Sequence, residues 1–277
     1  MQRERLTFAG EFGGLGALGL AESDALFAAD GRLSDRMEAL PGPRGSRRVR
    51  FPLAGTPDAR GRLLERPGAL APGWVRLTAF QEPAWSELLR ARLSAPRSTS
   101  LAEREWNLLC HLRNHGAGTP EPLIVGARGN GFVARRSFLL VRELEGALPF
   151  DRWLRPEGLS GLPGERERGL RSVGLFLANL ERAGVLVPGL EPAHLWITPA
   201  GGECEHEEPG APRKNHLPGV ALSEVSGGRF AASTAVRAML VELCAALAGV
   251  LTEDELAHVR DLALGGAAHA KVHAERA

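Results

Sequence analysis

Two stretches of the sequence have residue types that could do chemistry. The run from Glu203 to Glu208, with His216 beyond it, gathers carboxylates, a thiol and imidazoles, all of which can bind metal. Tetrahedral zinc sites use paired Cys and His spacings that this run lacks, so we interpret it as a charged surface loop. Gly14 to Gly19 matches G-x-G-x-x-G, but only a short helical stretch follows it. A dinucleotide site needs a strand–turn–helix unit, so we interpret this motif as a glycine-rich turn.

The charged residues are biased in type. The basic residues are nearly all arginine, and the only lysines are Lys214 and Lys271. No aspartate lies between Asp151 and Asp254. The arginine-rich stretch 44–50 could contact anions, although such stretches are more often solvated. Neither G-x-S-x-G nor H-E-x-x-H occurs, so the sequence lacks the signatures of a serine hydrolase elbow and of a zinc protease helix.

The composition is that of an ordinary globular protein. The chain has 277 residues, which is enough for one large domain or two lobes. Its net charge of +1 creates no general attraction for nucleic acid, so we expect no nucleic-acid partner. No apolar run is long enough to span a bilayer, because Glu242 interrupts the best candidate, Ala238 to Leu251. Three widely spaced cysteines and the absence of a signal peptide favour a reducing cytoplasm.

The elements expected in the first half are mainly strands around one helix. The alternation of Gly73 to Phe80 suits a half-buried strand. Ser100 and Glu103 have the spacing of a capping box, which predicts a helix that ends at His115-Gly116. Further strands are expected at Arg48 to Leu53, Leu123 to Ala127 and Ser137 to Glu143.

Helices dominate the second half. We expect them at Glu165 to Gly184, Thr234 to Leu251 and Glu253 to Leu264, the last beginning with a second capping box at Thr252 and Glu255. Val185 to Thr198 reads as irregular, and Val220 to Val225 as a short strand. This order predicts an α+β protein of two lobes. The lobes are residues 1–145, with 1–30 as an N-terminal extension, and residues 146–277.

Several motifs resemble the lipopolysaccharide kinase (Kdo/WaaP) family. The strongest are Ala102-Glu-Arg-Glu105-Trp106, then Leu112 to Pro120, then Arg135-Arg-Ser137-Phe-Leu-Leu-Val-Arg-Glu143-Leu144. Leu180-Glu-Arg-Ala-Gly184-Val185 resembles the helix before the family's catalytic loop. The resemblance implies a protein-kinase-like fold, with a small strand-rich N-lobe and a helical C-lobe.

The resemblance also implies where the nucleotide-holding groups stand. Kinases use a strand lysine, paired with a helix glutamate, to hold the nucleotide phosphates. In this chain Arg76 takes the lysine position and Glu105 the glutamate position. Arginine can still pair with a carboxylate or a phosphate, but its shape differs from that of lysine. The alternative is that both residues are simply solvated.

The catalytic and metal positions depart further from the family pattern. Val187-Pro188-Gly189 stands in place of His-Arg-Asp, so Gly189 takes the position of the proton acceptor. Glu191 is a weak substitute base, and His194 either lines the nucleotide site or is a structural histidine. Glu224 best matches the metal-binding aspartate, although its side chain is one methylene longer. ATP and Mg²⁺ are therefore implied by the resemblance, with binding weakened or lost.

Our hypothesis from the sequence is a pseudokinase that acts by binding or regulation. The alternative is an unusual active kinase that phosphorylates a sugar of lipopolysaccharide or a related envelope glycan, and a third class is a non-kinase fold of mixed elements. The expected partner is a protein or an envelope glycan. The expected location is the cytoplasm, either free or peripheral at the inner face of the membrane.

Overall fold

The chain folds into two compact units. The computed structural model describes residues 3–9, 15–18, 20, 22–29, 33–34, 36–42, 45–53, 73–81, 83, 85–94, 98–129, 134–144, 146–155, 158–159, 164–198, 219–225 and 227–274. Unit 1 comprises Met1–Cys110 and Pro120–Glu145, and unit 2 comprises His111–Thr119 and Gly146–Ala277. The run 203–208, His216, Gly14, Gly19 and Glu145 lie outside the described residues.

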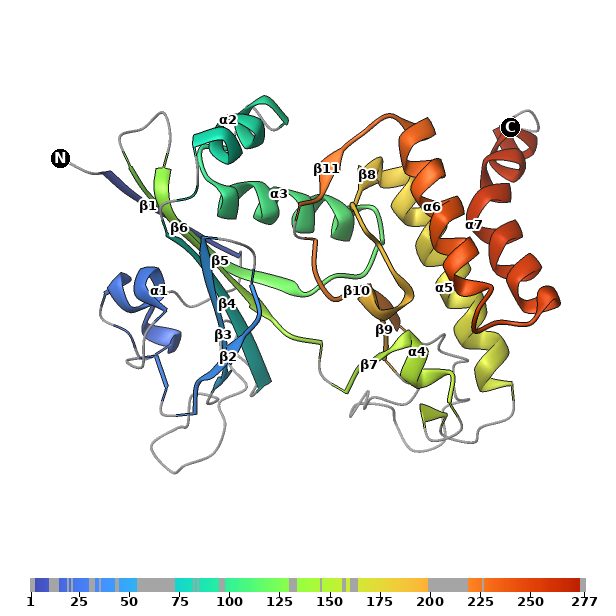
Figure 1. Ribbon diagram of the computed structural model, residues 1–277, viewed down its shortest axis with the longest axis horizontal. Coiled ribbons are helices and arrows are strands. Elements are labelled where there is room, and N and C mark those ends of the chain that lie inside the picture. Colours follow the sequence, from blue (N-terminus) through green and yellow to red (C-terminus); the bar gives the residue numbers. More distant parts are fainter. Residues whose placement is uncertain are drawn as a thin grey trace. The chain divides into compact units, whose positions relative to one another are not determined.

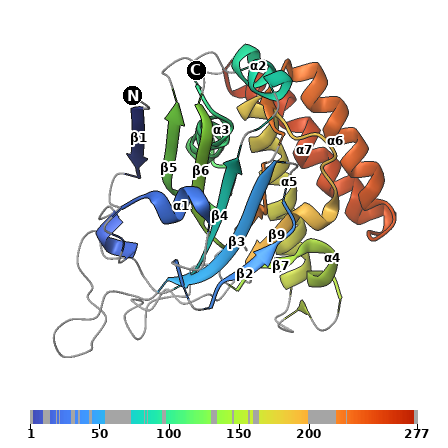
Figure 2. The same ribbon diagram turned by 60° about the vertical axis from the view of Figure 1, so that its left-hand side comes forward.

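Unit 1 is built on one antiparallel sheet. Its six strands follow the order β1-β5-β6-β4-β3-β2, and α1 lies across one face, against β4 and β6 (Figures 1 and 2). The strands are β1 Arg3–Phe8, β2 Glu38–Leu40, β3 Ser46–Leu53, β4 Gly73–Gln81, β5 Glu121–Gly129 and β6 Ala134–Arg142; the helices are η1 Leu15–Leu18, α1 Asp24–Ala28, α2 Trp85–Ser94 and α3 Leu101–Asn114.

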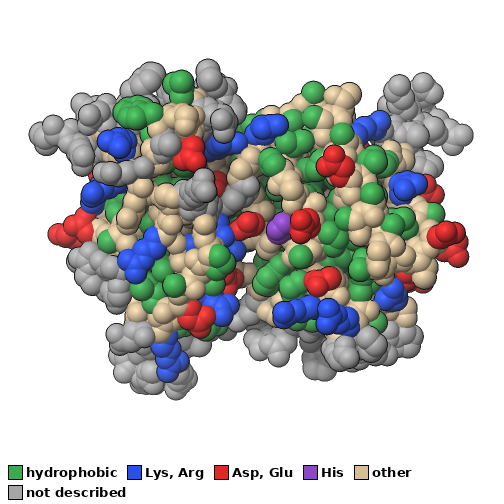
Figure 3. All heavy atoms as spheres, in the orientation of Figure 1, with side chains coloured by type: hydrophobic (Ala, Val, Ile, Leu, Met, Phe, Trp, Pro, Cys, Tyr) green, Lys and Arg blue, Asp and Glu red, His purple; other side chains and the backbone are tan. Residues whose placement is uncertain are grey.

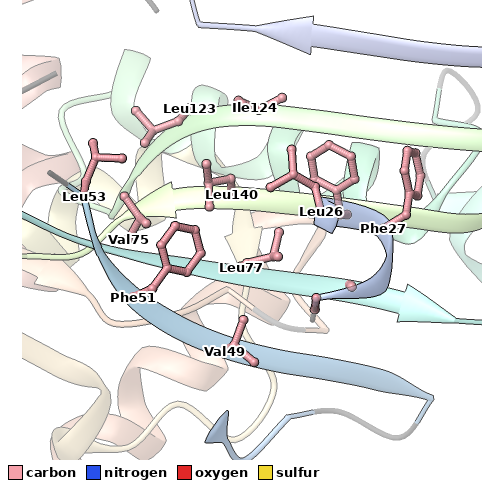
Figure 4. Close-up of a cluster of buried hydrophobic side chains, with 13 residues drawn as sticks. Leu26, Phe27, Val49, Phe51, Leu53, Val75, Leu77, Leu123, Ile124 and Leu140 are labelled. Atoms are coloured by element: carbon pink, nitrogen blue, oxygen red, sulfur yellow. The ribbon is translucent and has the colours of Figure 1, made fainter. Parts of the chain in front are cut away.

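The main core of unit 1 lies on the face of the sheet that α1 covers (Figure 4). Alternate residues of the strands point to this face, so Val49 stands opposite Leu77, and Phe51 opposite Val75. Leu26 and Phe27 of α1 close the core, and the Phe27 ring meets that of Phe138 edge-on. The buried side predicted for β4 is confirmed, because Val75, Leu77 and Ala79 are fully buried, whereas Thr78 on the other side is buried as well and not exposed as predicted.

The first turn of α3 departs in one detail from the expected capping box. The Ser100 hydroxyl accepts the Glu103 amide at 3.1 Å, as predicted. The Glu103 carboxylate, however, receives the amide of Thr99 at 2.6 Å, one residue earlier than the box requires. Arg5 of β1 also donates to Glu103, at 2.6 Å, so the carboxylate joins the helix start to an edge strand.

Unit 2 contains the main helices and two small sheets. Its sheets have the orders β10-β9-β7 and β11-β8. The strands are β7 Leu148–Pro149, β8 Val185–Leu186, β9 Leu195–Thr198, β10 Gly219–Leu222 and β11 Arg229–Phe230; the helices are α4 Phe150–Trp153, α5 Glu165–Ala183, η3 Pro192–His194, α6 Ser233–Leu247 and α7 Glu253–Ala274.

Two of our expectations for unit 2 were wrong. The segment Val185 to Thr198 is not simply irregular, because β8 and β9 lie at its two ends and pair with later strands. Helix α7 does not stop at Gly265-Gly266 but continues to Ala274. A glycine in a helix costs only about 1 kcal/mol relative to alanine, and the alanine-rich residues that follow are strong helix formers.

Close packing and ion pairs between helices hold unit 2 together. A Cβ added to Gly169 of α5 would lie 2.0 Å from the Trp153 ring, so the fully buried indole of α4 fits only against glycine. Arg166 of α5 donates to both carboxylate oxygens of Glu255 in α7, at 2.6 and 3.1 Å. Glu255 also receives the Thr252 amide at 3.0 Å, which confirms the second capping box.

The surface carries charges of both signs. Acidic and basic side chains of the described residues are interspersed over the face drawn in Figure 3, in keeping with the net charge of +1. Within the part of the chain that the structure describes, no helix has the length and apolarity needed to cross a membrane.

Candidate functional site

Arg76 lies on the second face of the unit 1 sheet, away from the α1 core. It stands in the middle of β4, is half-buried, and pairs with Arg50 on β3 and Val141 on β6. Two arginines directly opposite one another are unfavourable unless other groups offset their charges. Arg76 has an interaction partner in the structure.

Arg50 and Trp74 extend this charged face. The Arg50 guanidinium lies 5.0 Å from the centre of the Trp74 ring, within the range of a cation–π contact. It donates to Glu38 of β2 at 2.7 Å, and it lies 4.0 Å from Glu143 just after β6. Arg50 and Trp74 were not predicted as site residues from the sequence. The alternation of arginine with buried residues in β3 nevertheless indicates that Arg50 lies on the same face as Arg76.

Glu105 lies on α3, in the same unit as Arg76. It is half-buried and also has an interaction partner. Glu103, two residues earlier, accepts hydrogen bonds from the Thr99 amide at the start of the helix and from Arg5. The two acidic residues of this helix therefore have different surroundings, and the family role assigned to Glu105 stays a prediction.

Gly189 is a turn residue with no functional side chain. The run Val187-Pro188-Gly189-Leu190 has proline then glycine at its centre, which is the preference of a type II turn. Gly189 has a φ of +68°, as the third position of such a turn requires. A Cβ added there would meet nothing within 4 Å, so the backbone conformation, not crowding, favours glycine.

Glu191 and His194 are joined to each other in the next turn. The His194 amide donates to the Glu191 side chain, and the Glu191 amide donates to Nδ1 of His194 at 3.0 Å. Because Nδ1 accepts, Nε2 is the ring nitrogen that remains able to donate. The pair caps η3, whose Pro192 is at its first position. Both residues thus have a structural role, which the sequence left open for His194.

Glu224 follows strand β10, at the end that lies beside His194. Strands β9 and β10 are antiparallel with Leu195 opposite Leu222, and the Ser223 amide donates to the His194 carbonyl at 2.9 Å. The hairpin therefore brings the 189–194 turn and Glu224 to one end of one small sheet. Glu224 is half-buried and has an interaction partner.

The described residues contain no cluster of three or more metal-binding side chains. Among them, no three His, Cys, Asp or Glu side chains converge as a metal site would require. Mg²⁺ binds through one or two carboxylates together with substrate phosphates. Glu224 could supply one carboxylate, and Gly189 and the structurally engaged Glu191 supply no second one near it.

The two units together define a class of protein. An antiparallel sheet bears the candidate phosphate anchor, a helix carries the candidate glutamate, and a helical unit presents a turn followed by a hairpin. This is a protein-kinase-like fold. A solved structure described as WaaP in complex with acyl carrier protein has the same fold, with a TM-score of 0.59 and 15% identity over 94% of this chain and 88% of the other.

The family is identified by sequence. Residues 73–207 match the model of the lipopolysaccharide kinase (Kdo/WaaP) family, a segment that includes Arg76, Glu105, Gly189 and His194. This match supports the family that the sequence motifs predicted. A comparison with curated proteins found no match. The predicted fold class and family are thereby confirmed, whereas the assigned roles of the individual site residues stay predictions.

Proposed function

We propose that this chain is a pseudokinase that binds a nucleotide or another phosphorylated ligand and acts on a partner without transferring phosphate. The observation that carries the proposal is the conformation at Gly189. By its resemblance to the family, Gly189 stands at the position of the proton acceptor, and its backbone is the left-handed one of a tight turn. Loss of a general base lowers a reaction rate by about 10²–10⁴.

The neighbouring groups do not replace the missing base. Glu191 has its carboxylate on the His194 amide as a helix cap, so its use as a base would weaken the turn that positions it. Glu224 is the one described carboxylate that follows the neighbouring strand, and Mg²⁺ held between phosphates usually has one or two such ligands. Among the residues that the structure describes, this region therefore offers one carboxylate for Mg²⁺ and no proton acceptor at the position of Gly189.

Binding is supported by the groups that remain in unit 1. Arg76 keeps a cation at the position that anchors phosphates in the family, and a guanidinium can contact two phosphate oxygens at once. When bound, ATP would supply the triphosphate that this cation meets. The neighbouring WaaP structure was solved with acyl carrier protein, which makes a protein the partner we favour. We place this activity in the cytoplasm, in connection with envelope biosynthesis.

Calorimetric titration tests the binding half of the proposal. We expect ATP to bind, with at most a small effect of Mg²⁺ on affinity, and to raise the melting temperature. A ligand present at 100 times its Kd stabilises a protein by about 2.7 kcal/mol. The Arg76→Ala variant should bind more weakly and lose about half of this gain. Arg47→Ala, which removes an exposed arginine from neighbouring β3, is the matched control and should keep it.

A phosphate-transfer assay tests the other half. We expect no transfer above background with ATP and Mg²⁺, either to solvent or to sugar acceptors. The active-kinase alternative is favoured by one observation, the location of Glu224 at the end of β10 beside His194. Mg²⁺-dependent turnover that disappears in Glu224→Gln would establish that alternative and overturn the pseudokinase.

A further inference from the structure

Two histidines lie one helical turn apart at the end of α3. His111 and His115 are four residues apart, and the His115 amide donates to the His111 carbonyl at 3.2 Å, so the helical turn continues through His115. Side chains at this spacing are neighbours on the surface of a helix. The centres of the two rings are 4.2 Å apart, and the ring planes are inclined at 38°. Both residues are half-buried, so the pair is partly open to solvent.

Backbone carbonyls fix the tautomer of both rings. Nε2 of His111 lies 2.8 Å from the carbonyl oxygen of Ala183 in α5, and Nδ1 of His115 lies 2.9 Å from the carbonyl oxygen of His111. A carbonyl oxygen only accepts hydrogen bonds, so each of these two nitrogens carries a hydrogen and donates it. In the neutral rings the lone pairs are therefore on Nδ1 of His111 and Nε2 of His115.

These hydrogen bonds are of the kind that metal-binding histidines make. Such a histidine generally donates its second ring nitrogen to a backbone carbonyl or a carboxylate, which orients the ring and raises the basicity of the ligand nitrogen. The ligand nitrogens lie about 2.0–2.1 Å from the ion, so two nitrogens on one ion are at most about 4 Å apart. Rings whose centres are 4.2 Å apart can meet this limit.

The surrounding contacts of unit 2 hold the two rings in place. Phe230 of β11 meets the His111 ring edge-on, with 4.9 Å between the ring centres. Gly116 ends the helical turn with a φ of +72°, and Asn179 of α5 donates to its carbonyl at 2.9 Å. Because the rings are already positioned, an ion that binds them loses little affinity to ordering of the side chains.

The neighbouring residues indicate which class of ion the pair would take. Arg182 precedes Ala183 in the sequence, and Arg229 precedes Phe230, so positive side chains flank the pair. A cation held by charge alone is therefore disfavoured. Mg²⁺ and Ca²⁺ also require oxygen ligands, whereas neutral imidazole suits Zn²⁺, Cu²⁺ and Ni²⁺.

We propose that His111 and His115 form a binding site for a divalent transition-metal ion of the Zn²⁺ and Cu²⁺ class. His111 binds through Nδ1 and His115 through Nε2, and water completes the coordination. Two protein ligands are fewer than a closed structural zinc site has, so the ion exchanges with solvent. Because His111 also bonds Ala183, a bound ion stabilises the contact between the ends of α3 and α5. The site does not depend on nucleotide binding or on phosphate transfer.

Titration calorimetry of the full chain with Zn²⁺ tests the proposal. We expect His115→Ala to raise the Kd for Zn²⁺ at least about tenfold, which corresponds to about 1.4 kcal/mol. His115→Asn keeps a side chain that can donate to the His111 carbonyl, and it should weaken binding as much, which separates loss of a ligand from loss of a helix-end hydrogen bond. The electron paramagnetic resonance spectrum of bound Cu²⁺ should show two imidazole nitrogens in the wild type and one in His115→Ala.

Control variants test whether other histidines account for the binding. The sequence contains a second pair at the same spacing, His269 and His273, and replacing both with alanine should leave the Kd of the tightest site unchanged. His258→Ala, which removes an exposed histidine of α7, should also leave it unchanged.

Three results would overturn the proposal. They are a wild type that does not bind Zn²⁺, a His111→Ala, His115→Ala double variant that binds it as tightly as the wild type does, and loss of the tightest site in the His269→Ala, His273→Ala variant. The proposed function is tested separately, because Arg76→Ala should keep the wild-type Kd for Zn²⁺ and His115→Ala should keep the melting shift that ATP causes.

Discussion

Units 1 and 2 differ in what they retain at the family's functional positions. In unit 1, charged residues stand at both positions, Arg76 on β4 and Glu105 on α3. In unit 2, the acceptor position is a glycine in a tight turn, and the neighbouring acid and histidine cap a short helix. Under our assignments, unit 1 keeps charged residues at the positions that bind the nucleotide phosphates. Unit 2 has turn-forming residues at the positions that carry out phosphate transfer.

Unit 2 is closely packed around Trp153, and the largest effect we predict tests this packing. Gly169→Ala places a methyl group 2.0 Å from the Trp153 ring, so the indole or α5 must move. Overpacking of this kind costs about 3 kcal/mol. Chemical denaturation should show the loss.

The matched control is the same substitution in open space. Gly265→Ala lies within α7, where an added Cβ meets nothing within 4 Å. It should stabilise the protein by about 0.5–1 kcal/mol through helix propensity. If Gly169→Ala lowered stability no more than Gly265→Ala does, unit 2 would be loosely packed around Trp153. The comparison between a closely packed fold and its altered site positions would then fail.

The second prediction concerns the ion pair that joins α5 to α7. The hydrogen bonds from Arg166, with a smaller contribution from Thr252, lower the pKa of Glu255 from 4.5 to about 2. Because the folded-state pKa is depressed, the stabilisation is present above about pH 4.5 and is lost as the pH falls towards 2. The full shift is worth about 3 kcal/mol, and we expect about 2 because Arg166 is 36% exposed.

Urea unfolding across this pH range measures the effect. Glu255→Gln should lower stability by about 2 kcal/mol at neutral pH and should flatten the acid limb of the stability curve. Glu181→Gln removes the partner of the more exposed Arg237 and should cost less than about 1 kcal/mol. Equal losses in the two variants would mean that the Glu255 pair behaves as an ordinary surface ion pair.

The third prediction sharpens the comparison on the side of unit 1. Arg76→Lys restores the residue type of the family at the anchor position. We expect it to bind ATP within about threefold of the wild type, whereas Arg76→Ala should bind about tenfold more weakly, a difference of about 1.4 kcal/mol. Titration calorimetry distinguishes the two. Equal affinities for all three proteins would remove Arg76 from the binding site.

Much of the scaffold was accessible from the sequence because local signals agreed with the final structure. The capping residues Ser100 and Thr252 fixed where two helices begin, and the alternation in β4 gave the buried face. Strand β1 was missed because its Arg-Glu-Arg start looks polar, and it is a strand only through pairing with β5. Helix α2, which lies between Pro83 and Pro96, was not predicted.

The candidate site was less accessible, for a physical reason. The sequence resemblance indicated which residues correspond to the family's functional positions. It could not indicate the role of a side chain that hydrogen-bonds to the backbone amide of a neighbour. The mutual capping of Glu191 and His194 arises from backbone geometry. The pairing of Arg50 with Arg76 requires the register of two strands. Both become visible only once the chain is folded.

The smallest effect is predicted for a substitution that restores the missing acid. Gly189→Asp puts a carboxylate where the family has its proton acceptor, and the added Cβ has open space around it. The left-handed backbone makes the variant about 1 kcal/mol less stable, a modest loss because aspartate tolerates this conformation better than most residues. Phosphate transfer should stay at background, because an acceptor alone does not supply the second metal ligand. Gly189→Ala is the control for backbone strain. A gain in transfer of about 10² or more in the aspartate variant alone would show that unit 2 lacks one group and not several, and the difference between the two units would then reduce to a single residue.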